Sequence, residues 1–323
     1  MRLLVGSLLC ALALAPAVEL TFRASQTTLA RTATLERTGE LAIAVTIDGE
    51  PALDVNSTSK VAEARTLRVT DALGKLENAR PKTMRRTFQA FESTIEYERD
   101  ERSSKVTHVS PLVGETVVFI AKQADAPLVG VWPPDRRGDE ELLEDLVEDL
   151  DLRGLLPAHA VAVGDSWKAD VSVVRDLLFP GGDLKSHSKN AAAAAPEDRK
   201  LAQDLGRDIE GNLTVRLESV EGELARLALT LDVKLTGSSP IPTAADTEFR
   251  SPVRGTRQVT WTYEGGGSAT WHVAKGRLTS LELAADALET EIETTTTPFP
   301  SGTIDVVTTS TFTGKLTLGL SIR

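Results

Sequence analysis

Apolar and polar residues alternate one by one over long stretches of this 323-residue chain. From Leu41 to Ile47 every second residue is Leu, Ile or Val, and the same spacing recurs from Leu227 to Leu235. Successive side chains of a β-strand point to opposite faces of a sheet. Each stretch therefore predicts a strand with one buried face.

Further strands are expected in both halves of the chain. Residues 61–70 and 84–98 are rich in Thr, Val, Arg and Phe, and residues 117–120 form a short apolar run. In the last third, residues 213–217, 278–288 and 312–322 have the strand pattern. Glu221-Gly222-Glu223 is short enough for a hairpin turn, and we expect Gly265-Gly266-Gly267 to join residues 259–263 and 269–273 as a second hairpin.

The middle of the chain has a different spacing. Between Asp139 and Leu152 the apolar residues fall on one helical stripe opposite eight acidic side chains, which predicts an amphipathic helix. Residues 171–179 are expected to form a short helix that Pro180-Gly181-Gly182 ends. A mobile Ser, Asn and Ala stretch at 186–195 and a third helix at 197–205 complete this region.

These patterns favour an α+β fold. The expected architecture is one large curved antiparallel sheet, similar to half a barrel, with a helical middle segment packed against its concave face. We divide the chain into a signal peptide (1–17), an N-terminal β region (18–135), a helical middle region (136–207) and a C-terminal β region (208–323). Whether the two β regions form one sheet or two domains stays open at this point.

The first 17 residues are typical of a secretory signal peptide. Arg2 precedes an apolar run from Leu3 to Ala15, and Ala15-Pro16-Ala17 places small residues at the two positions that a signal peptidase reads. The run is too short to cross a bilayer as a helix, which needs about 20 residues. We expect cleavage before Val18 and export to the periplasm or the cell exterior.

Charge and cysteine content limit the partners. Loss of Arg2 with the signal peptide changes the net charge from −11 to −12, which disfavours nucleic acid and anionic membrane surfaces. The single cysteine, Cys10, lies in the apolar run of the signal peptide, so the mature chain is expected to hold no disulfide and no thiolate nucleophile. Leu9 stands where a lipobox requires a small residue, which favours cleavage after Ala17 over lipidation of Cys10.

Gly164-Asp165-Ser166-Trp167 is the most distinctive local motif. It is similar to the nucleophile motif of GDSL-type hydrolases, but it lies in the middle of the chain, and no histidine has an aspartate three residues before it. We therefore interpret Gly164-Asp165 as a turn. Trp167 is expected to anchor the segment that follows in the core.

No cofactor or metal site is expected. The acidic run has no EF-hand spacing, and the four histidines include no pair separated by three residues. The candidate ligand-binding residues are Trp167, Trp261 and Trp271, which could line a binding cavity; the alternative for each is a place in the core.

Several segments together resemble a group of uncharacterised secreted bacterial proteins, common in planctomycetes. They are Ser110–Val117, the acidic Asp-Glu-Glu-Leu-Leu stretch, the Leu156–Trp167 segment with the pattern L-P-x-x-x-V-x-V-G-D-x-W, and Trp271–Leu283. This resemblance implies no biochemical activity. In architecture alone, a long antiparallel sheet around helices is similar to the lipoprotein carriers of the bacterial envelope.

The leading hypothesis is a non-enzymatic envelope protein that holds an apolar ligand, such as a lipid or a lipidated peptide, between sheet and helices. The alternative is a structural or protein-interaction module of the envelope. An enzyme would require a pocket that gathers carboxyl groups of raised pKa from distant strands.

Overall fold

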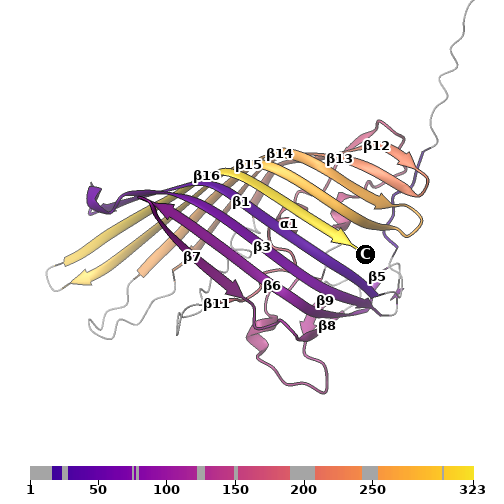
Figure 1. Cartoon of the computed structure of the whole chain (residues 1–323), viewed down its shortest axis with the longest axis horizontal. Helices are drawn as coiled ribbons and strands as arrows, with labels where there is room; N and C mark the ends of the chain where they lie inside the picture. Colours follow the sequence, from indigo (N-terminus) through magenta and orange to yellow (C-terminus); the bar gives the residue numbers. More distant parts are fainter. Residues whose placement is uncertain are drawn as a thin grey trace, which may run out of the picture.

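The chain is built around one large antiparallel sheet (Figure 1). The computed structural model describes residues 17–23, 28–74, 76–77, 80–121, 128–148, 152–189, 208–241, 254–299 and 302–323. Along the sheet the strand order is β10-β12-β13-β14-β15-β16-β1-β3-β6-β7-β11, with β2 paired to β1, β8 to β6 and β9 to β8.

Eight of its strands have 14 or more residues: β1 (Thr28–Ile47), β3 (Ser57–Leu73), β6 (Thr83–Arg99), β12 (Asp208–Glu221), β13 (Leu224–Pro240), β14 (Arg254–His272), β15 (Arg277–Phe299) and β16 (Gly302–Ile322). The shorter strands are β2 (Glu50–Pro51), β7 (Arg102–Val109), β8 (Thr116–Ala121), β9 (Leu128–Val131), β10 (Ser166–Lys168) and β11 (His187–Ser188). A separate pair is formed by β4 (Leu76–Glu77) and β5 (Arg80–Pro81).

The N-terminal and C-terminal β regions belong to one sheet. Strand β1 pairs with β16 over most of its length, so that Leu35 lies opposite Leu318 and Gly39 opposite Gly314. This seam between β1 and β16 joins segments that lie more than 250 residues apart in the chain and answers the question that the sequence pattern left open.

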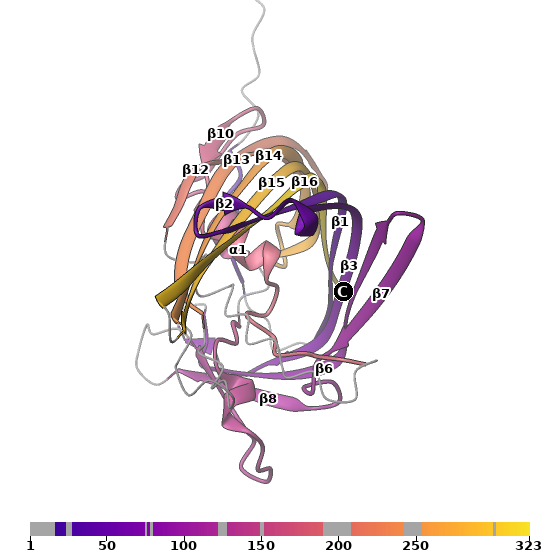
Figure 2. The same cartoon turned by 90° about the vertical axis from the view of Figure 1, so that its left-hand side faces the viewer.

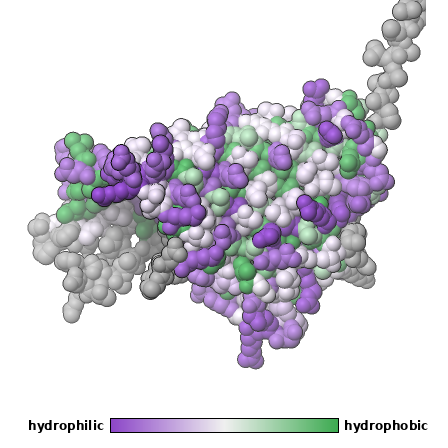
Figure 3. All heavy atoms as spheres, in the orientation of Figure 1, coloured by the Kyte–Doolittle hydropathy of each residue, from purple (hydrophilic) through white to green (hydrophobic). Residues whose placement is uncertain are grey.

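The sheet curves around its own core. Figure 2 shows strands β12 to β16 arching over the interior, β1 and β3 descending at one side, and α1 inside the arc. Buried and exposed residues alternate along β13, and its buried side chains are Leu, Val and Ala on one face. The strand prediction from alternation is confirmed, and the apolar face is the concave one. On the outer face polar and apolar side chains are interspersed (Figure 3).

The expected hairpin at Gly265-Gly266-Gly267 is wrong. Strand β14 runs straight through these glycines and pairs with β13 on one side and β15 on the other. A Cβ on Gly267 would lie 2.0 Å from the backbone oxygen of Glu282, and one on Gly265 would lie 2.1 Å from that of Ala284. The glycines permit a close approach of neighbouring strands, which is a second use of glycine besides turns. The hairpin turn at Gly222 between β12 and β13 is confirmed.

The α+β assignment is also wrong, because the described residues lie mostly in antiparallel strands and those of the middle region include little helix. The described helical elements are α1 (Val173–Leu178) and three short 3₁₀ turns at Leu53–Val55, Glu140–Leu143 and Arg153–Leu155. The short helix expected at 171–179, ended by Pro180, is confirmed as α1. The helix expected at 197–205 lies outside the described residues, as does most of the stretch 186–195.

The amphipathic helix predicted between Asp139 and Leu152 is wrong. The described residues of this run, 139–148 and 152, form a 3₁₀ turn followed by irregular chain. Asp145 has a left-handed backbone conformation, and Leu146 forms a β-bridge with Gly182. The carbonyl oxygens of Val147 and Glu148 accept hydrogen bonds from Arg86, whereas in a helix they would accept from their own segment. Tertiary hydrogen bonds therefore replace the helix, although Leu143 and Leu146 are still buried.

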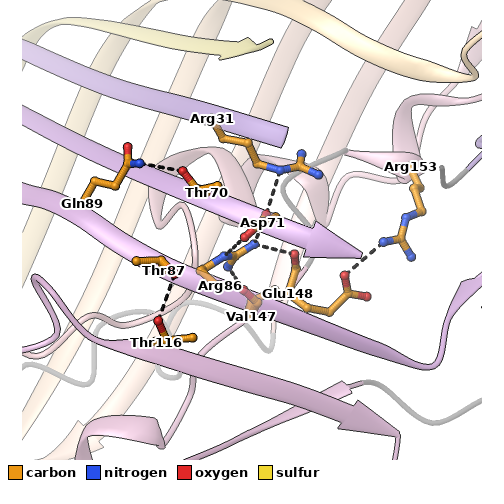
Figure 4. A network of polar contacts seen from close by, with 10 residues as sticks. All are labelled: Arg31, Thr70, Asp71, Arg86, Thr87, Gln89, Thr116, Val147, Glu148 and Arg153. Carbon is orange, nitrogen blue, oxygen red and sulfur yellow. Dashed lines mark hydrogen bonds and ion pairs between the residues drawn. The ribbon is translucent and has the colours of Figure 1, made fainter. Parts of the chain in front are cut away.

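A buried ion-pair triad fastens this middle segment to the sheet (Figure 4). Arg86 donates from Nε and Nη2 to the two carboxylate oxygens of Asp71, at 2.7 and 2.9 Å. Arg31 Nε lies 2.7 Å from Asp71 Oδ2, and both side chains of that pair are at most 1% exposed. Arg86 thus connects Asp71 on β3 with Val147 and Glu148 of the middle segment.

Candidate functional site

A cavity of about 570 Å³ lies between the concave face of the sheet and residues 178–186, which we call the cover. Its volume is within the range of small-molecule sites, about 300–1,000 Å³. Its lining is mixed, with an apolar wall beside a set of charged and hydroxyl-bearing side chains. The apolar wall includes Leu35, Leu41, Ile43, Val61, Phe91, Ile95, Leu178, Leu184, Trp261, Phe312 and Leu316.

Five polar side chains from four strands meet in this cavity, and we call them the cavity polar cluster. Arg37 lies between two carboxylates: its Nη2 is 2.9 Å from Glu63 Oε2, and its Nη1 donates to Glu289 Oε2. Arg65 Nη2 donates to Glu63 Oε1 at 2.9 Å, and the Tyr263 hydroxyl donates to Glu289 Oε1 at 2.9 Å. The two carboxyl groups are 6% and 8% exposed, so the cluster is largely shielded from bulk water.

Strand register brings these groups together. Arg37 on β1 lies directly opposite Glu63 on β3. On the other side of β1, the ring of Phe312 occupies the space that side chains on Gly39 and Gly314 would fill. The Arg37 guanidinium stacks on this ring, 4.6 Å from its centroid. Two glycines and one aromatic ring therefore leave a position on the concave face where a half-buried arginine fits.

The pKa values of the two glutamates are shifted in opposite directions. Burial raises the pKa of Glu63, but Arg65 and Arg37 outweigh it, and the net pKa is lowered from 4.5. Burial also raises the pKa of Glu289; Arg37 and the Tyr263 hydroxyl offset only part of this, and the net pKa is raised from 4.5. Glu289 is thus a carboxyl of raised pKa in a pocket, as the enzyme hypothesis requires, whereas Glu63 is not.

This difference predicts opposite pH dependences for two matched variants. A carboxyl whose folded-state pKa is raised stabilises the protein fully below pH 4.5 and loses that contribution as the pH rises through the folded-state value. The destabilisation by Glu289→Gln should therefore shrink as the pH is raised from 4.5. For Glu63→Gln the destabilisation should instead shrink as the pH falls below 4.5, because the pKa of Glu63 is lowered. Urea unfolding at a series of pH values measures both slopes, and slopes of equal sign would contradict the assignment.

The three candidate tryptophans lie in different places. Trp261 lines the cavity, stacked on Phe179 of the cover with 6.2 Å between ring centroids and edge-on to Tyr263 at 6.4 Å. Trp271 is fully buried and Trp167 half-buried, and both lie outside the cavity lining.

The turn expected at Gly164-Asp165 is confirmed. Gly164 has a positive φ of 98°, and the Asp165 carboxylate accepts a hydrogen bond from the backbone N–H of Ala162 at 2.8 Å. Trp167 follows on β10 and donates from its indole Nε1 to the Leu155 carbonyl at 2.8 Å. This motif is a structural connection between the middle segment and β12, with which β10 pairs.

The cavity polar cluster was not anticipated from the sequence. The available signal is a charged residue at a position where alternation requires an inward side chain. Arg37 follows Leu35 at such a position, and Glu289 follows Ala285 and Ala287 in the same way. A buried charge requires a partner, so these residues could have been paired in principle.

Comparisons with known proteins give no family. No protein-family model matches the sequence. The phenylalanine–tRNA ligase alpha subunit of Leuconostoc citreum (strain KM20) is 37% identical over 102 residues, which are 29% of this chain; the chain thus covers 28% of that protein's length. This match is too short to assign the chain to that family.

Solved structures align with most of the chain but only at low similarity. OccK7 (OpdD) of Pseudomonas aeruginosa aligns with 91% of this chain and 98% of its own, at 9% identity and a TM-score of 0.19. The P. putida toluene transporter TodX has 8% identity and a TM-score of 0.14, over 92% of this chain and 91% of its own. TM-scores at this level establish no shared fold. Among the described residues, no helix has the length and apolar character needed to cross a membrane.

Proposed function

We propose that this protein is an exported, non-enzymatic envelope protein that binds an apolar ligand, such as a lipid or the acyl chain of a lipidated peptide, in the cavity under the cover. The observation that carries this proposal is the cavity itself, of about 570 Å³, with apolar walls contributed by β1, β3, β6, β14 and β16. Protein cores are normally close-packed, and the buried Leu and Val side chains of this core leave the cavity unfilled.

Export is supported by the signal-peptide pattern of residues 1–17 and by the position of Val18. In the structure the backbone of Val18 exchanges two hydrogen bonds with Val161, of 2.7 and 2.9 Å. The residue expected at the mature N-terminus is therefore part of the folded domain. An envelope protein that carries apolar molecules requires such a sheltered site, because these molecules are poorly soluble in water.

Filling the cavity tests the proposal. Ser310 on β16 lines the cavity and is only half-buried, so Ser310→Trp places an indole in the ligand space without removing a buried group. We expect the affinity for an apolar fluorescent probe to fall by about tenfold or more, since the lost contact area is worth more than about 1.4 kcal/mol. Probe titration measures this directly.

Thr309→Trp is the matched control, because Thr309 is the preceding residue of the same strand and does not line the cavity. With Ala42 and Ala44 it lines a separate, shallow hollow of about 340 Å³. The control should bind the probe like the wild type. Equal binding by Ser310→Trp and wild type would place the probe elsewhere and overturn the proposal.

A second candidate is a protein-interaction module, favoured by the exposed tip of the β1–β3 connection. Ile47, Leu53 and Val55 are 43%, 74% and 54% exposed, and all three lie at or beside the 3₁₀ turn of this tip. A photo-crosslinking residue at Leu53 should capture one defined envelope protein in whole cells if this surface binds a partner. Uniform labelling of many proteins would argue against it.

A further inference from the structure

Hydrogen-bond donors are in excess within the cavity polar cluster. A guanidinium group carries five N–H donors. Arg37 donates to Glu63 and Glu289, and Arg65 donates to Glu63 and, over 3.5 Å, to the Leu178 carbonyl. Within the part of the chain that the structure describes, the Nε atoms of Arg37 and Arg65 are buried and have no hydrogen-bond partner. Buried donors without an acceptor cost free energy. The Nε atoms themselves have no surface open to the cavity, so a ligand with oxygen acceptors would contact the Nη hydrogens of these partly exposed guanidinium groups.

Each carboxylate oxygen of the cluster, in contrast, already has a donor. Each of the four carboxylate oxygens of Glu63 and Glu289 contacts a donor of Arg37, Arg65 or Tyr263. A ligand with an ammonium group would compete with these donors for the same oxygens. The cluster is therefore suited to a ligand group that accepts hydrogen bonds rather than one that donates them.

Both arginines reach the cavity, and apolar side chains continue from them along the strands. The Arg37 and Arg65 side chains are 22% and 25% exposed and belong to the cavity lining. On β1 the inward positions after Arg37 and Gly39 are Leu41 and Ile43, which also line the cavity. A polar group at the arginines and an apolar chain beside Leu41 and Ile43 would fit the same space.

We propose that the cavity binds a long-chain carboxylate, with the carboxylate held by Arg65 and Arg37 and the hydrocarbon chain packed along β1 and β6. This inference rests on the proposed apolar-ligand function and narrows it to one chemical class. A carboxylate matches the planar fork of donors that a guanidinium presents, and charge-assisted hydrogen bonds of this kind are about twice as strong as neutral ones.

Of the other charged side chains in the cavity lining, Glu144, Asp145, Asp183 and Glu291 are acidic and Lys185 is basic. Glu291 at the rim belongs to the ion pair with Arg257, at 2.7 Å. Lys185 of the cover lies 3.6 Å from Glu141, and Glu144 is exposed. The two arginines of the cluster are thus the cations best placed to receive an anion inside the cavity.

Three ligands with the same chain and different ends test the inference on the full mature protein. Hexadecanoate, hexadecanol and hexadecylamine are titrated separately against the wild type by displacement of a fluorescent probe. We expect hexadecanoate to bind about tenfold more tightly than hexadecanol, as a charge-assisted hydrogen bond predicts, and hexadecylamine to bind most weakly. Equal affinities of the acid and the alcohol would overturn the inference.

Variants assign the preference to Arg65. Arg65→Met should bind the acid and the alcohol with equal affinity, whereas Arg68→Met, on the exposed face of the same strand, should keep the wild-type preference. If Arg65→Met does not fold, Arg65→Gln replaces it, since it retains two donors and loses the charge. An unchanged preference in a folded Arg65 variant would also overturn the inference.

The two proposals fail differently. If hexadecanol binds as well as hexadecanoate, the cavity still holds apolar ligands and only the carboxylate assignment is lost. If a bound probe is displaced by none of the three compounds, the carboxylate assignment is likewise lost. If neither the probe nor any of the three compounds binds to the wild type, the apolar-ligand function itself is wrong.

Discussion

Replacing Asp71 by Asn should destabilise the protein by about 3–5 kcal/mol, because it removes the carboxylate that two buried arginines share. Arg31 and Arg86 both contact Asp71, and the Asp71 and Arg86 side chains have no exposed surface. An Asn of the same shape leaves two guanidinium charges in the core without an anion. Denaturant unfolding, monitored by tryptophan fluorescence, measures the loss in the free energy of unfolding.

Asp286→Asn is the control for this prediction. Asp286 forms an ion pair with Lys315 in the same sheet, but the two side chains are 69% and 71% exposed, respectively. Exposed pairs are worth about 0–1 kcal/mol, so the control should unfold close to the wild type. Similar losses for Asp71→Asn and Asp286→Asn would contradict the role of the buried triad in holding the middle segment on the sheet.

Gly39→Val is expected to cost about 3 kcal/mol, the upper part of the usual range for overpacking. A Cβ at Gly39 would lie 2.2 Å from the backbone oxygen of Thr313 and 2.9 Å from the Phe312 ring. The strand seam between β1 and β16 would have to open, or Phe312 would have to leave its place under Arg37. Both changes disturb the wall of the cavity as well as the sheet.

Thr38→Val tests the same β-branched side chain one residue earlier, on the exposed face of β1. It should leave the free energy of unfolding nearly unchanged, because Val is favourable in exposed strands. A Gly39→Val protein that unfolds at the same urea concentration as Thr38→Val would show that the close approach at the seam is not required.

The strands were predictable because alternation is a local signal. The buried residues of β1 and β13 follow from the period of two alone, and the Gly222 turn follows from a glycine between two such runs. The glycines of β14 were misread for the same reason. A glycine run has the same local signal in a turn as in a strand that needs close backbone contact, and only the neighbouring strand distinguishes the two.

The middle region and the cavity depend on long-range contacts. The acidic run has helical spacing, but its carbonyls at Val147 and Glu148 are taken by Arg86, which lies about 60 residues earlier. The cavity polar cluster requires Glu289 to meet Arg37 across the β1–β16 seam, a separation of 252 residues. No local pattern records such a pairing. Alternation places the charges of Arg37 and Glu289 on the inward face, but it does not show that the two side chains meet.

The most direct test of the central claim is native mass spectrometry of the wild type, Ser310→Trp and Thr309→Trp, each purified from cells of the native host. The account predicts one apolar adduct per chain in the wild type and in Thr309→Trp, and its loss in Ser310→Trp, where the indole fills the cavity. Extraction of the adduct then identifies its head group. An adduct retained in Ser310→Trp, or the absence of any adduct from all three proteins, would contradict a ligand cavity between the sheet and its cover.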